Sequence, residues 1–461
     1  MMNSGHRARA VVVGAAVSVL AGCSTFKDQL LDPQQPGIIA PEQVGSPTAA
    51  NALRVGAISR LKTATMGTGG NETMWTMGGL LTDEWKSGDT FSQRVETDQR
   101  TVQESNADVA TFYRSEHEAR GAARDAIDAL NKYLPEPKAN IAQMYWAMGL
   151  AEDQLSEAFC NGVPFGVTVD GVPNYSDPMT NVQGFTLALA HIDSGLALAT
   201  ASDTFSVNTK YNLLVTKARI LIQLGRFTDV PAVTASVPTN YRWYMTFSAT
   251  TADNPVWSFN SSQKRWVVGD SFDVTGVIKN ALPFASAKDP RVPVTGTSVN
   301  SSLKVAFDNF TQFVSQSLWG RDDWGPVISG IDARLYEAEA KLQASDIAGM
   351  MTILNDLRAS PQKLTNVYTT PVMPALPTPA TQNDAINLYF REKAFWVFSR
   401  GQRLGDLRRL VRQYKRPQDQ VFPTGTFHKN GNPPYGSDVN FPVTSNETPN
   451  PNFHGCLDRN A

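Results

Sequence analysis

The sequence has little of what most enzymes and metalloproteins need for their chemistry. Its 461 residues include only three cysteines and five histidines. The histidines are too scattered for the spacing of metal ligands: His6, His117, His191, His428 and His454. There is no G-x-S-x-G elbow, no phosphate-binding P-loop and no glycine-rich dinucleotide motif. We therefore predict no catalytic residues, no metal and no cofactor, although the two carboxylates of a glycosidase would leave no such pattern.

Charge is also scarce. Only 18% of the residues are charged, against about a quarter in average soluble domains, and the net charge is −2. No basic surface for nucleic acid is therefore expected. The 41% of hydrophobic residues can form a sizeable core, and 33 glycines and 28 prolines indicate extensive loops. After the first 20 residues, no apolar run approaches the length of a membrane span.

The N-terminus has the organisation of an export signal. Basic residues precede a short apolar run, Ala10 to Leu20, which ends in Leu20-Ala21-Gly22-Cys23. This ending resembles the lipobox of bacterial lipoproteins, in which the cysteine is diacylated and becomes the new N-terminus. The alternative is an ordinary secretory signal with a chance cysteine. We predict a signal peptide over residues 1–22 and lipidation of Cys23, since acylation with more than one chain anchors stably.

The remainder divides into a tether and one large domain. Residues 23–47 are polar and contain proline and glycine, which indicates a flexible tether. Residues 48–461 are predicted to form a single domain. With Cys23 lipidated, Cys160 and Cys456 remain as an even pair in an oxidising compartment. We predict that they form a disulfide; the alternative is two buried free thiols.

Helical periodicity is clearest near the C-terminus. Ile386, Phe390, Ala394 and Val397 form one apolar stripe, and Gly401 supplies a residue that tolerates positive φ where the stripe stops. A second helix follows with its leucines inward. Its arginines are expected on a solvated outer face: Arg403, Arg408, Arg409 and Arg412.

An internal pattern links two further helix pairs. Ala218-x6-Gly225 recurs as Ala338-x6-Ser345, with a small residue that lets helices approach and a turn residue that ends the first helix. This is the logic of tetratricopeptide repeats, in which one hairpin must stack on its neighbours to bury its face. The pattern by itself predicts an array of helical hairpins.

Several motifs resemble one family. Glu392, Gly401, Arg403, Asp406, Leu407 and Arg409 fall at the spacing of the signature of the SusD/RagB outer-membrane lipoproteins. The chain departs from that signature at Trp396 and Arg400, where the family often has glutamate. Further matches follow the family's order along the chain: Phe159 to Pro164, Asp289-Pro290-Arg291, Phe441-Pro442-Val443 and Asn450-Pro451-Asn452.

The resemblance implies both a fold and a function. The fold would be all-α, with four tetratricopeptide-like hairpins over about 106–160, 180–236, 331–360 and 382–413. These would pack against an irregular, tryptophan-rich and loop-rich region of about 240–325 with a few short strands. The protein would be a binding lipoprotein of the cell outer membrane, facing the exterior, and not an enzyme. It would deliver a nutrient, a glycan or oligosaccharide by family analogy, to a TonB-dependent β-barrel transporter.

Two other classes of protein are alternatives to this function. A scaffold lipoprotein that binds another envelope protein would need no tryptophan-rich insert. A surface hydrolase is disfavoured by the missing motifs. The identity of the ligand stays open.

The ligand site is predicted where tryptophans on loops adjoin polar residues, because sugar rings stack on aromatic faces and their hydroxyls need polar partners. Two segments that the family brings to one face meet this description. The predicted ligand-binding residues are Trp75, Asp83, Glu84, Trp85 and Arg94 in the first, and Trp266, Trp319, Arg321 and Trp324 in the second. Some tryptophans must be core residues, and we expect Trp243 and Trp257 to be among them. Adjacent carboxylates such as Asp83 and Glu84 are more often a helix-end feature than a catalytic pair.

Overall fold

The computed structural model describes residues 45–68, 72–169, 172–295 and 305–461. The predicted signal peptide, Cys23 and nearly all of the tether lie outside these residues. Residues 45–461 form one compact unit. Within the described part, no helix has the length and apolar character needed to cross a membrane.

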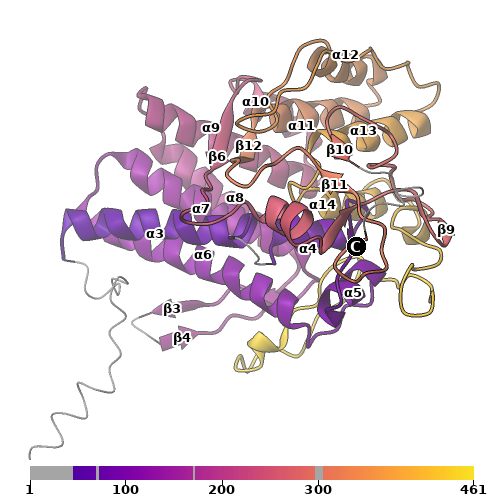
Figure 1. Cartoon of the computed structure of the whole chain (residues 1–461). Helices are drawn as coiled ribbons and strands as arrows, with labels where there is room; N and C mark the ends of the chain where they lie inside the picture. The colour runs from indigo at the N-terminus through magenta and orange to yellow at the C-terminus, as the bar shows by residue number, and fades with distance from the viewer. Residues whose placement is uncertain (1–44, 69–71, 170–171, 296–304) are drawn as a thin grey trace, which may run out of the picture. The chain divides into compact units, whose positions relative to one another are not determined.

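The unit is built mainly from helices (Figure 1). The helices of the first half are α3 (Pro47–Thr65), α4 (Met74–Leu80), α5 (Ser92–Gln99), α6 (Ala107–Tyr133), α7 (Lys138–Ala158), α8 (Asn181–Leu198), α9 (Thr204–Gln223) and α10 (Val230–Thr234). Those of the second half are α11 (Gly330–Gln343), α12 (Ile347–Arg358), α13 (Gln382–Trp396) and α14 (Arg403–Arg412). Short 3-10 or π turns cover Phe227–Asp229, Trp257–Ser262, Gln418–Gln420 and Ser445–Glu447.

Most long helices begin at a residue that can cap their free N–H groups. The Asn106 side chain accepts hydrogen bonds from Asp108 and Val109 at the start of α6. Thr180 and Ser329 form capping boxes at the starts of α8 and α11, in which the N-cap and N3 residues bond each other's backbone. Local sequence therefore fixes where these helices start.

Successive helices pack on each other along the chain. α3 packs on α6, α6 on α7, α7 on α8 and α8 on α9; α11 then contacts α9, α12 and α13. Figure 1 shows this as a progression from α3 and α6 to α12 and α13. The predicted all-α fold of tetratricopeptide-like hairpins with a few short strands is confirmed.

The repeated pattern has the expected geometry. Ala218 and Ala338 are fully buried where their helices meet neighbours. Gly225 and Ser345 both adopt positive φ, 73° and 59°, directly after α9 and α11. In both turns, a backbone N–H one residue later bonds back five residues, from Arg226 to Leu221 and from Asp346 to Lys341. The two hairpins thus share one type of turn, at which serine stands where glycine is easiest.

Strands are short and occur as two-stranded pairs among the described residues. They are β1 (Trp85–Ser87) with β7 (Trp266–Val268), β2 (Val163–Pro164) with β5 (Pro178–Met179), β3 (Val167–Val169) with β4 (Val172–Asn174), β6 (Arg242–Met245) with β12 (Gly325–Ser329), β8 (Phe272–Asp273) with β9 (Gly276–Val277), and β10 (Val294–Thr295) with β11 (Ser315–Gln316). All six pairs are antiparallel. Two pairs, β8–β9 and β10–β11, lie wholly in the predicted irregular region, and two more, β1–β7 and β6–β12, have one strand in it.

The arginines of α14 correct one expectation. Arg403, Arg408 and Arg409 are 4%, 0% and 1% exposed, so they do not form a solvated face. Arg403 makes two bonds to Asp83, at 2.7 and 2.8 Å. Arg409 pairs with Glu339 at 2.7 Å. The prediction failed because α14 lies between other elements, whose carboxylates and carbonyls reach its polar face.

Two motif segments meet in a buried ion pair. Arg291 of the Asp-Pro-Arg motif bonds Asp289 at 2.6 Å and Glu392 of the C-terminal signature at 2.6 Å. Its guanidinium also lies 5.0 Å from the ring centre of Trp396. Arg358 at the end of α12 approaches Glu392 at 3.0 Å. These motif residues therefore join α12, α13 and the irregular region.

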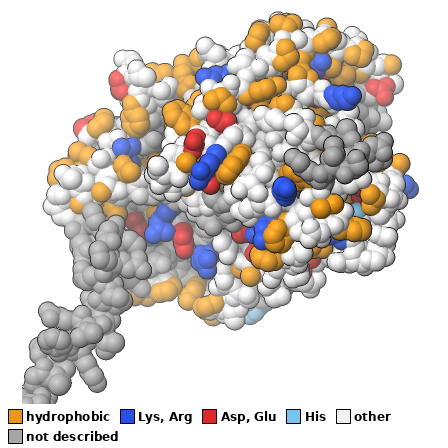
Figure 2. Space-filling model, viewed as in Figure 1, with side chains coloured by type: hydrophobic (Ala, Val, Ile, Leu, Met, Phe, Trp, Pro, Cys, Tyr) orange, Lys and Arg blue, Asp and Glu red, His pale blue; other side chains and the backbone are white. Residues whose placement is uncertain are grey.

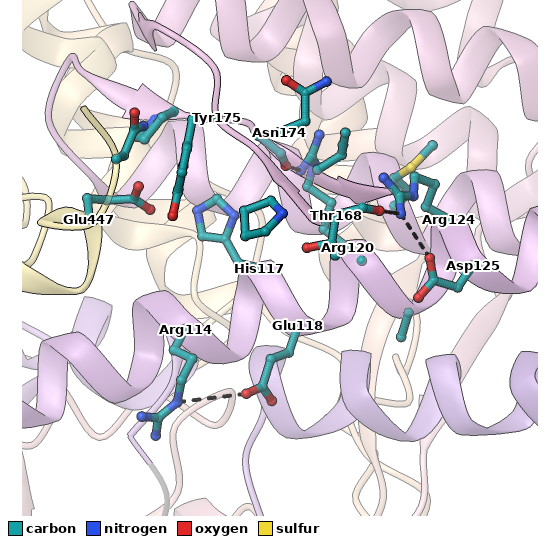
Figure 3. Close-up of a pocket in the computed structure, with 18 of the residues that line it drawn as sticks. Arg114, His117, Glu118, Arg120, Arg124, Asp125, Thr168, Asn174, Tyr175 and Glu447 are labelled. Atoms are coloured by element: carbon teal, nitrogen blue, oxygen red, sulfur yellow. Dashed lines mark hydrogen bonds and ion pairs between the residues drawn. The ribbon is translucent and has the colours of Figure 1, made fainter. Parts of the chain in front are cut away.

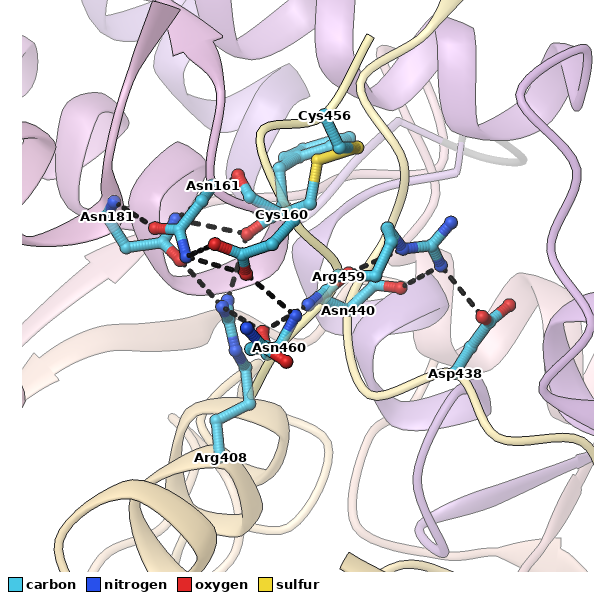
Figure 4. The surroundings of a disulfide bond; sticks show 11 residues. Cys160, Asn161, Asn181, Arg408, Asp438, Asn440, Cys456, Arg459 and Asn460 are labelled. Atoms are coloured by element: carbon cyan, nitrogen blue, oxygen red, sulfur yellow. Dashed lines mark hydrogen bonds and ion pairs between the residues drawn. A yellow bond between two sulfur atoms is a disulfide. The ribbon is translucent and has the colours of Figure 1, made fainter.

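Cys160 and Cys456 are joined in a disulfide that spans 296 residues (Figure 4). Around it, Asn161 bonds both carboxylate oxygens of Asp458 at 3.0 Å, and Arg408 bonds Asn181 at 2.7 Å. The chain-entropy model gives so long a loop a stabilisation of roughly 5–6 kcal/mol. The C-terminal segment is thus fixed to the end of α7.

Candidate functional site

The two segments predicted to form the ligand site do come together. Strand β1 pairs with β7, although 180 or so residues separate them along the chain. The rings of Trp75 and Trp319 lie 6.1 Å apart. The guanidinium of Arg94 lies 5.0 Å from the ring centre of Trp266.

Exposure, however, differs from the prediction. Four of the five predicted tryptophans are only 2% exposed: Trp75, Trp85, Trp266 and Trp319. Their rings are enclosed because α4 and the β1–β7 pair pack into the body, and the indole N–H of Trp85 bonds Ser399 Oγ at 3.1 Å. In this structure they are core residues. Trp243 and Trp257, expected in the core, are half-buried instead.

The predicted charged residues of the first segment are buried too. Asp83 is held by Arg403. Glu84 is fully buried and accepts a hydrogen bond from the Ser399 backbone N–H at 2.8 Å. Burial raises the pKa of Glu84 to about 8, against the opposing effect of that hydrogen bond. These groups are enclosed in the interior and present no surface to a ligand.

Arg94 and Asp89 help to position Arg265, which lies between two exposed aromatic rings. It bonds Asp89 Oδ2 at 2.5 Å, and Arg265 bonds Asp89 Oδ1 at 2.5 Å. Burial alone would raise the pKa of Asp89, but the hydrogen bonds from Arg265 and Arg94 hold it below the usual value. The guanidinium of Arg265 then lies 4.7 Å from the ring centre of Phe91 and 3.8 Å from that of Phe307. A buried arginine–aspartate pair thus fixes a cation between two aromatic rings.

The most exposed aromatic residues near the predicted site are Phe91 and Phe307, which flank Arg265, and Phe310, three residues after Phe307. Phe91, Phe307 and Phe310 are 48%, 44% and 57% exposed, and we call them the phenylalanine platform. The turn that carries Phe310 is fixed by Asp308, which accepts hydrogen bonds from the Phe310 and Thr311 backbones at 2.9 and 2.8 Å. Apolar rings that stay exposed on a fixed turn are unfavourable in water, and no packing contact compensates for this. Such rings are typical of a binding surface.

An open hollow of about 560 Å³ adjoins Phe310 of the platform, and Val95 of α5 also lines it. Its lining residues are Asp89, Thr90, Val95, Asp308, Phe310, His428, Lys429, Asn430, Gly431 and Asn432. Three consecutive residues of its rim, Asn430, Gly431 and Asn432, adopt positive φ of 55°, 81° and 61°. Such strained backbone concentrates at functional sites, and here it places two asparagine amides at the edge of the hollow.

The charges of the hollow largely cancel. Lys429 Nζ lies 2.6 Å from Asp308. Burial would raise the pKa of Asp308, but the hydrogen bonds from Lys429 and Thr311 hold it below the usual value. Burial lowers the pKa of His428 to about 3, so its ring is neutral near pH 7. The groups left for a ligand are neutral amides, a hydroxyl and aromatic rings.

Two predicted residues lie on a different surface. Trp324 is 41% exposed and contacts Tyr244, with ring centres 6.2 Å apart. Arg321 pairs with Asp253 at 2.7 Å and does not line the hollow. The structure therefore separates Arg321 and Trp324 from the phenylalanine platform.

The platform phenylalanines are not among the predicted residues, because that prediction rested on tryptophan. A usable signal was present: Phe307-Asp308-Asn309-Phe310 places two phenylalanines around turn-forming residues in a non-periodic stretch.

Across the described ranges, no group of three or more His, Cys, Asp or Glu residues is arranged to hold a metal ion. On the face drawn in Figure 2, acidic and basic side chains are interspersed.

Comparisons with known proteins identify the fold. No protein-family model matches the sequence, and a search of curated proteins finds no match. A solved SusD superfamily protein from Bacteroides thetaiotaomicron is 12% identical with a TM-score of 0.62, over 90% of this chain and 100% of that one. A SusD-like carbohydrate-binding protein from Bacteroides vulgatus is 12% identical with a TM-score of 0.61, over 89% and 98%.

A laminarin-binding SusD-like protein is 13% identical with a TM-score of 0.58, over 89% of this chain and 99% of that one. The similarity thus spans nearly all of each neighbour. This chain has the SusD-like fold, which confirms at the level of the fold the resemblance seen in its motifs.

Proposed function

We propose that this protein is a SusD-family outer-membrane lipoprotein that binds a glycan on the phenylalanine platform and delivers it to a TonB-dependent transporter. The described neighbours that bind carbohydrate, one of them laminarin, support a glycan as the ligand. Binding rather than catalysis is the proposed activity, in line with the sequence motifs that are missing.

The observation that carries this proposal is the platform beside its neutral polar hollow. Sugar rings present apolar C–H faces that stack on aromatic rings, and their hydroxyls bond amides and other neutral polar groups. The platform supplies the first kind of contact, and Asn430 and Asn432 supply the second. A hollow of about 560 Å³ is within the range of pockets that hold small ligands.

Alanine replacement of Phe310 tests the site. Purified mature protein is titrated by calorimetry against a panel of neutral oligosaccharides that includes laminarin fragments. Loss of a stacked ring should weaken binding about tenfold or more, because burying a phenylalanine contributes about 1.5–3 kcal/mol. The melting temperature should change little, since Phe310 is 57% exposed.

A matched control uses Phe205, which is 36% exposed on α9 and has Arg54 at 5.7 Å. Phe205→Ala should leave the affinity unchanged. Equal affinity of wild type and Phe310→Ala for every glycan that binds would refute the platform as the site. Release of cleaved sugar on prolonged incubation would refute the absence of catalysis.

Anchoring and delivery rest on Leu20-Ala21-Gly22-Cys23 and on the family resemblance. Cys23→Ser should release the protein from membranes, and the wild type should co-purify with a large β-barrel protein after mild solubilisation. Unchanged membrane association of the variant would contradict anchoring through Cys23. Recovery of the wild type only as a free monomer would contradict the transporter partner.

A further inference from the structure

A second cavity, of about 590 Å³, lies apart from the platform (Figure 3). Helix α6, the β3–β4 hairpin and the segment around Glu447 form its walls. It shares no lining residue with the hollow beside Phe310. Any ligand taken here would therefore bind independently of the platform.

The charges along α6 distinguish this cavity from the first. Four arginines line it, Arg60, Arg114, Arg120 and Arg124, against three acids, Glu118, Asp125 and Glu447. Arg60 and Arg114 share Glu118, at 3.1 and 3.8 Å, so one carboxylate faces two cations. Glu447 accepts a hydrogen bond from the Tyr113 hydroxyl at 2.8 Å, and burial raises its pKa. Arg120 is paired with the buried Glu152 at 2.8 Å, so the excess of positive charge lies on Arg60, Arg114 and Arg124, which have only Glu118 and Asp125 as partners.

Some hydrogen-bond donors of this lining are not fully paired with acceptors of the protein itself, within the part that the structure describes. Arg124 pairs with Asp125 at 3.1 Å and donates to the Thr168 carbonyl, but its Nε atom is buried with no hydrogen-bond partner among the described residues. The same holds for Nε2 of His117. Arg114 is 59% exposed at its side chain and reaches Glu118 only at 3.8 Å. Tyr175, 41% exposed, adds an aromatic ring.

We propose that this cavity is a second binding site, for an acidic oligosaccharide with a carboxylate on its sugar rings. Arg114 and Arg124 are ten residues apart on α6, which is about 15 Å along the helix axis. One carboxylate cannot reach both, so two uronic acid residues of one chain, with a third residue between them, meet them. Tyr175 stacks on the ring between. Burial lowers the pKa of His117 to about 3, so its ring is neutral near pH 7 and bonds a hydroxyl. The specificity comes from guanidinium–carboxylate pairing, which the neutral hollow beside Phe310 does not offer.

Calorimetry with uronic acid trisaccharides tests this site in the mature protein. The probes are trigalacturonate, a mannuronate trisaccharide and a glucuronate-containing trisaccharide, each beside its carboxyl-reduced neutral form. At least one acidic probe should bind, its reduced form should bind at least tenfold more weakly, and added salt should weaken the acidic probe. Arg124→Gln and Arg114→Gln should each weaken it about tenfold.

Two control variants test whether the loss of binding is specific to this cavity. Arg226→Gln removes an arginine whose side chain is 53% exposed, close to the 59% of Arg114. Arg226 pairs with Asp229 at 2.6 Å and does not line the cavity, so this variant should have no effect. Phe310→Ala should also leave acidic binding unchanged, so that failure of the platform and failure of this cavity are told apart. The proposal is overturned if no acidic probe binds at millimolar concentration. It is equally overturned if Phe310→Ala, and not the arginine variants, abolishes acidic binding.

Discussion

Replacing Arg291 with methionine should show that a family motif of this chain is structural. Arg291 is 1% exposed and bonds two carboxylates, Asp289 and Glu392, both at 2.6 Å. Breaking a buried ion pair from one side costs about 3–5 kcal/mol, because the remaining charge stays buried without its partner. Here Arg358 still pairs with Glu392, and the Asp289 side chain is 14% exposed. We therefore expect a loss at the lower end, about 3 kcal/mol.

Urea unfolding followed by tryptophan fluorescence measures this loss. The unfolding entropy of a unit of about 420 residues is roughly 0.9 kcal/mol per kelvin, so the melting temperature should fall by about 3 °C. Arg226→Met is the matched control, since its exposed pair with Asp229 should contribute about 0–1 kcal/mol. Affinity for a platform ligand should stay unchanged. A loss below about 1 kcal/mol would refute this reasoning. Lost binding with stability intact would also refute it and would make Arg291 a ligand residue.

Two further predictions concern the interior and a turn. Burial raises the pKa of Glu84 to about 8 from 4.5, so the folded state holds a proton that the unfolded chain releases, and stability should fall as pH rises from about 5 to 8. Glu84→Gln should reduce that slope in melting curves, though not remove it, because burial also raises the pKa of Asp153 to about 8; an unchanged slope would contradict this. Ser345→Gly should relieve the positive φ of 59° and stabilise by up to about 1 kcal/mol, or about 1 °C. Ser345→Ala keeps the Cβ atom, so an equal gain from it would show that backbone strain is not the cause.

The helical frame could be predicted because its signals are local. Periodic apolar residues, N-caps such as Asn106 and turn residues such as Gly225 act within a few residues of each other. The burial of Arg403, Arg408 and Arg409 could not be predicted in this way. Their partners, among them Asp83 and Glu339, lie some 70 to 320 residues away in the sequence, and only tertiary packing brings them near.

The two segments expected at the ligand site do meet, but most of the side chains expected there are buried. Pairing of β1 with β7 brought the two expected segments together, yet a tryptophan in a polar, non-periodic stretch carries no mark of which way its ring points. Trp266 follows a π turn and enters the core, while Phe307 and Phe310 occupy a turn that projects into water. Exposure depends on backbone direction at each residue, which composition alone does not determine.

Buried motif residues and exposed loop residues have different roles, which explains why the motifs identify a fold but not a ligand. The motif residues that the structure describes, such as Arg291, Glu392, Arg403 and Arg409, are buried and paired, so they hold helices and loops in place. The groups available to a ligand, Phe310 and the two amides of the Asn430–Asn432 turn, lie on exposed loops and belong to no motif. At the proposed site, exchanging those loop residues should alter recognition while leaving the buried ion pairs intact. Ligand specificity must therefore be sought in the loops, by measuring binding residue by residue.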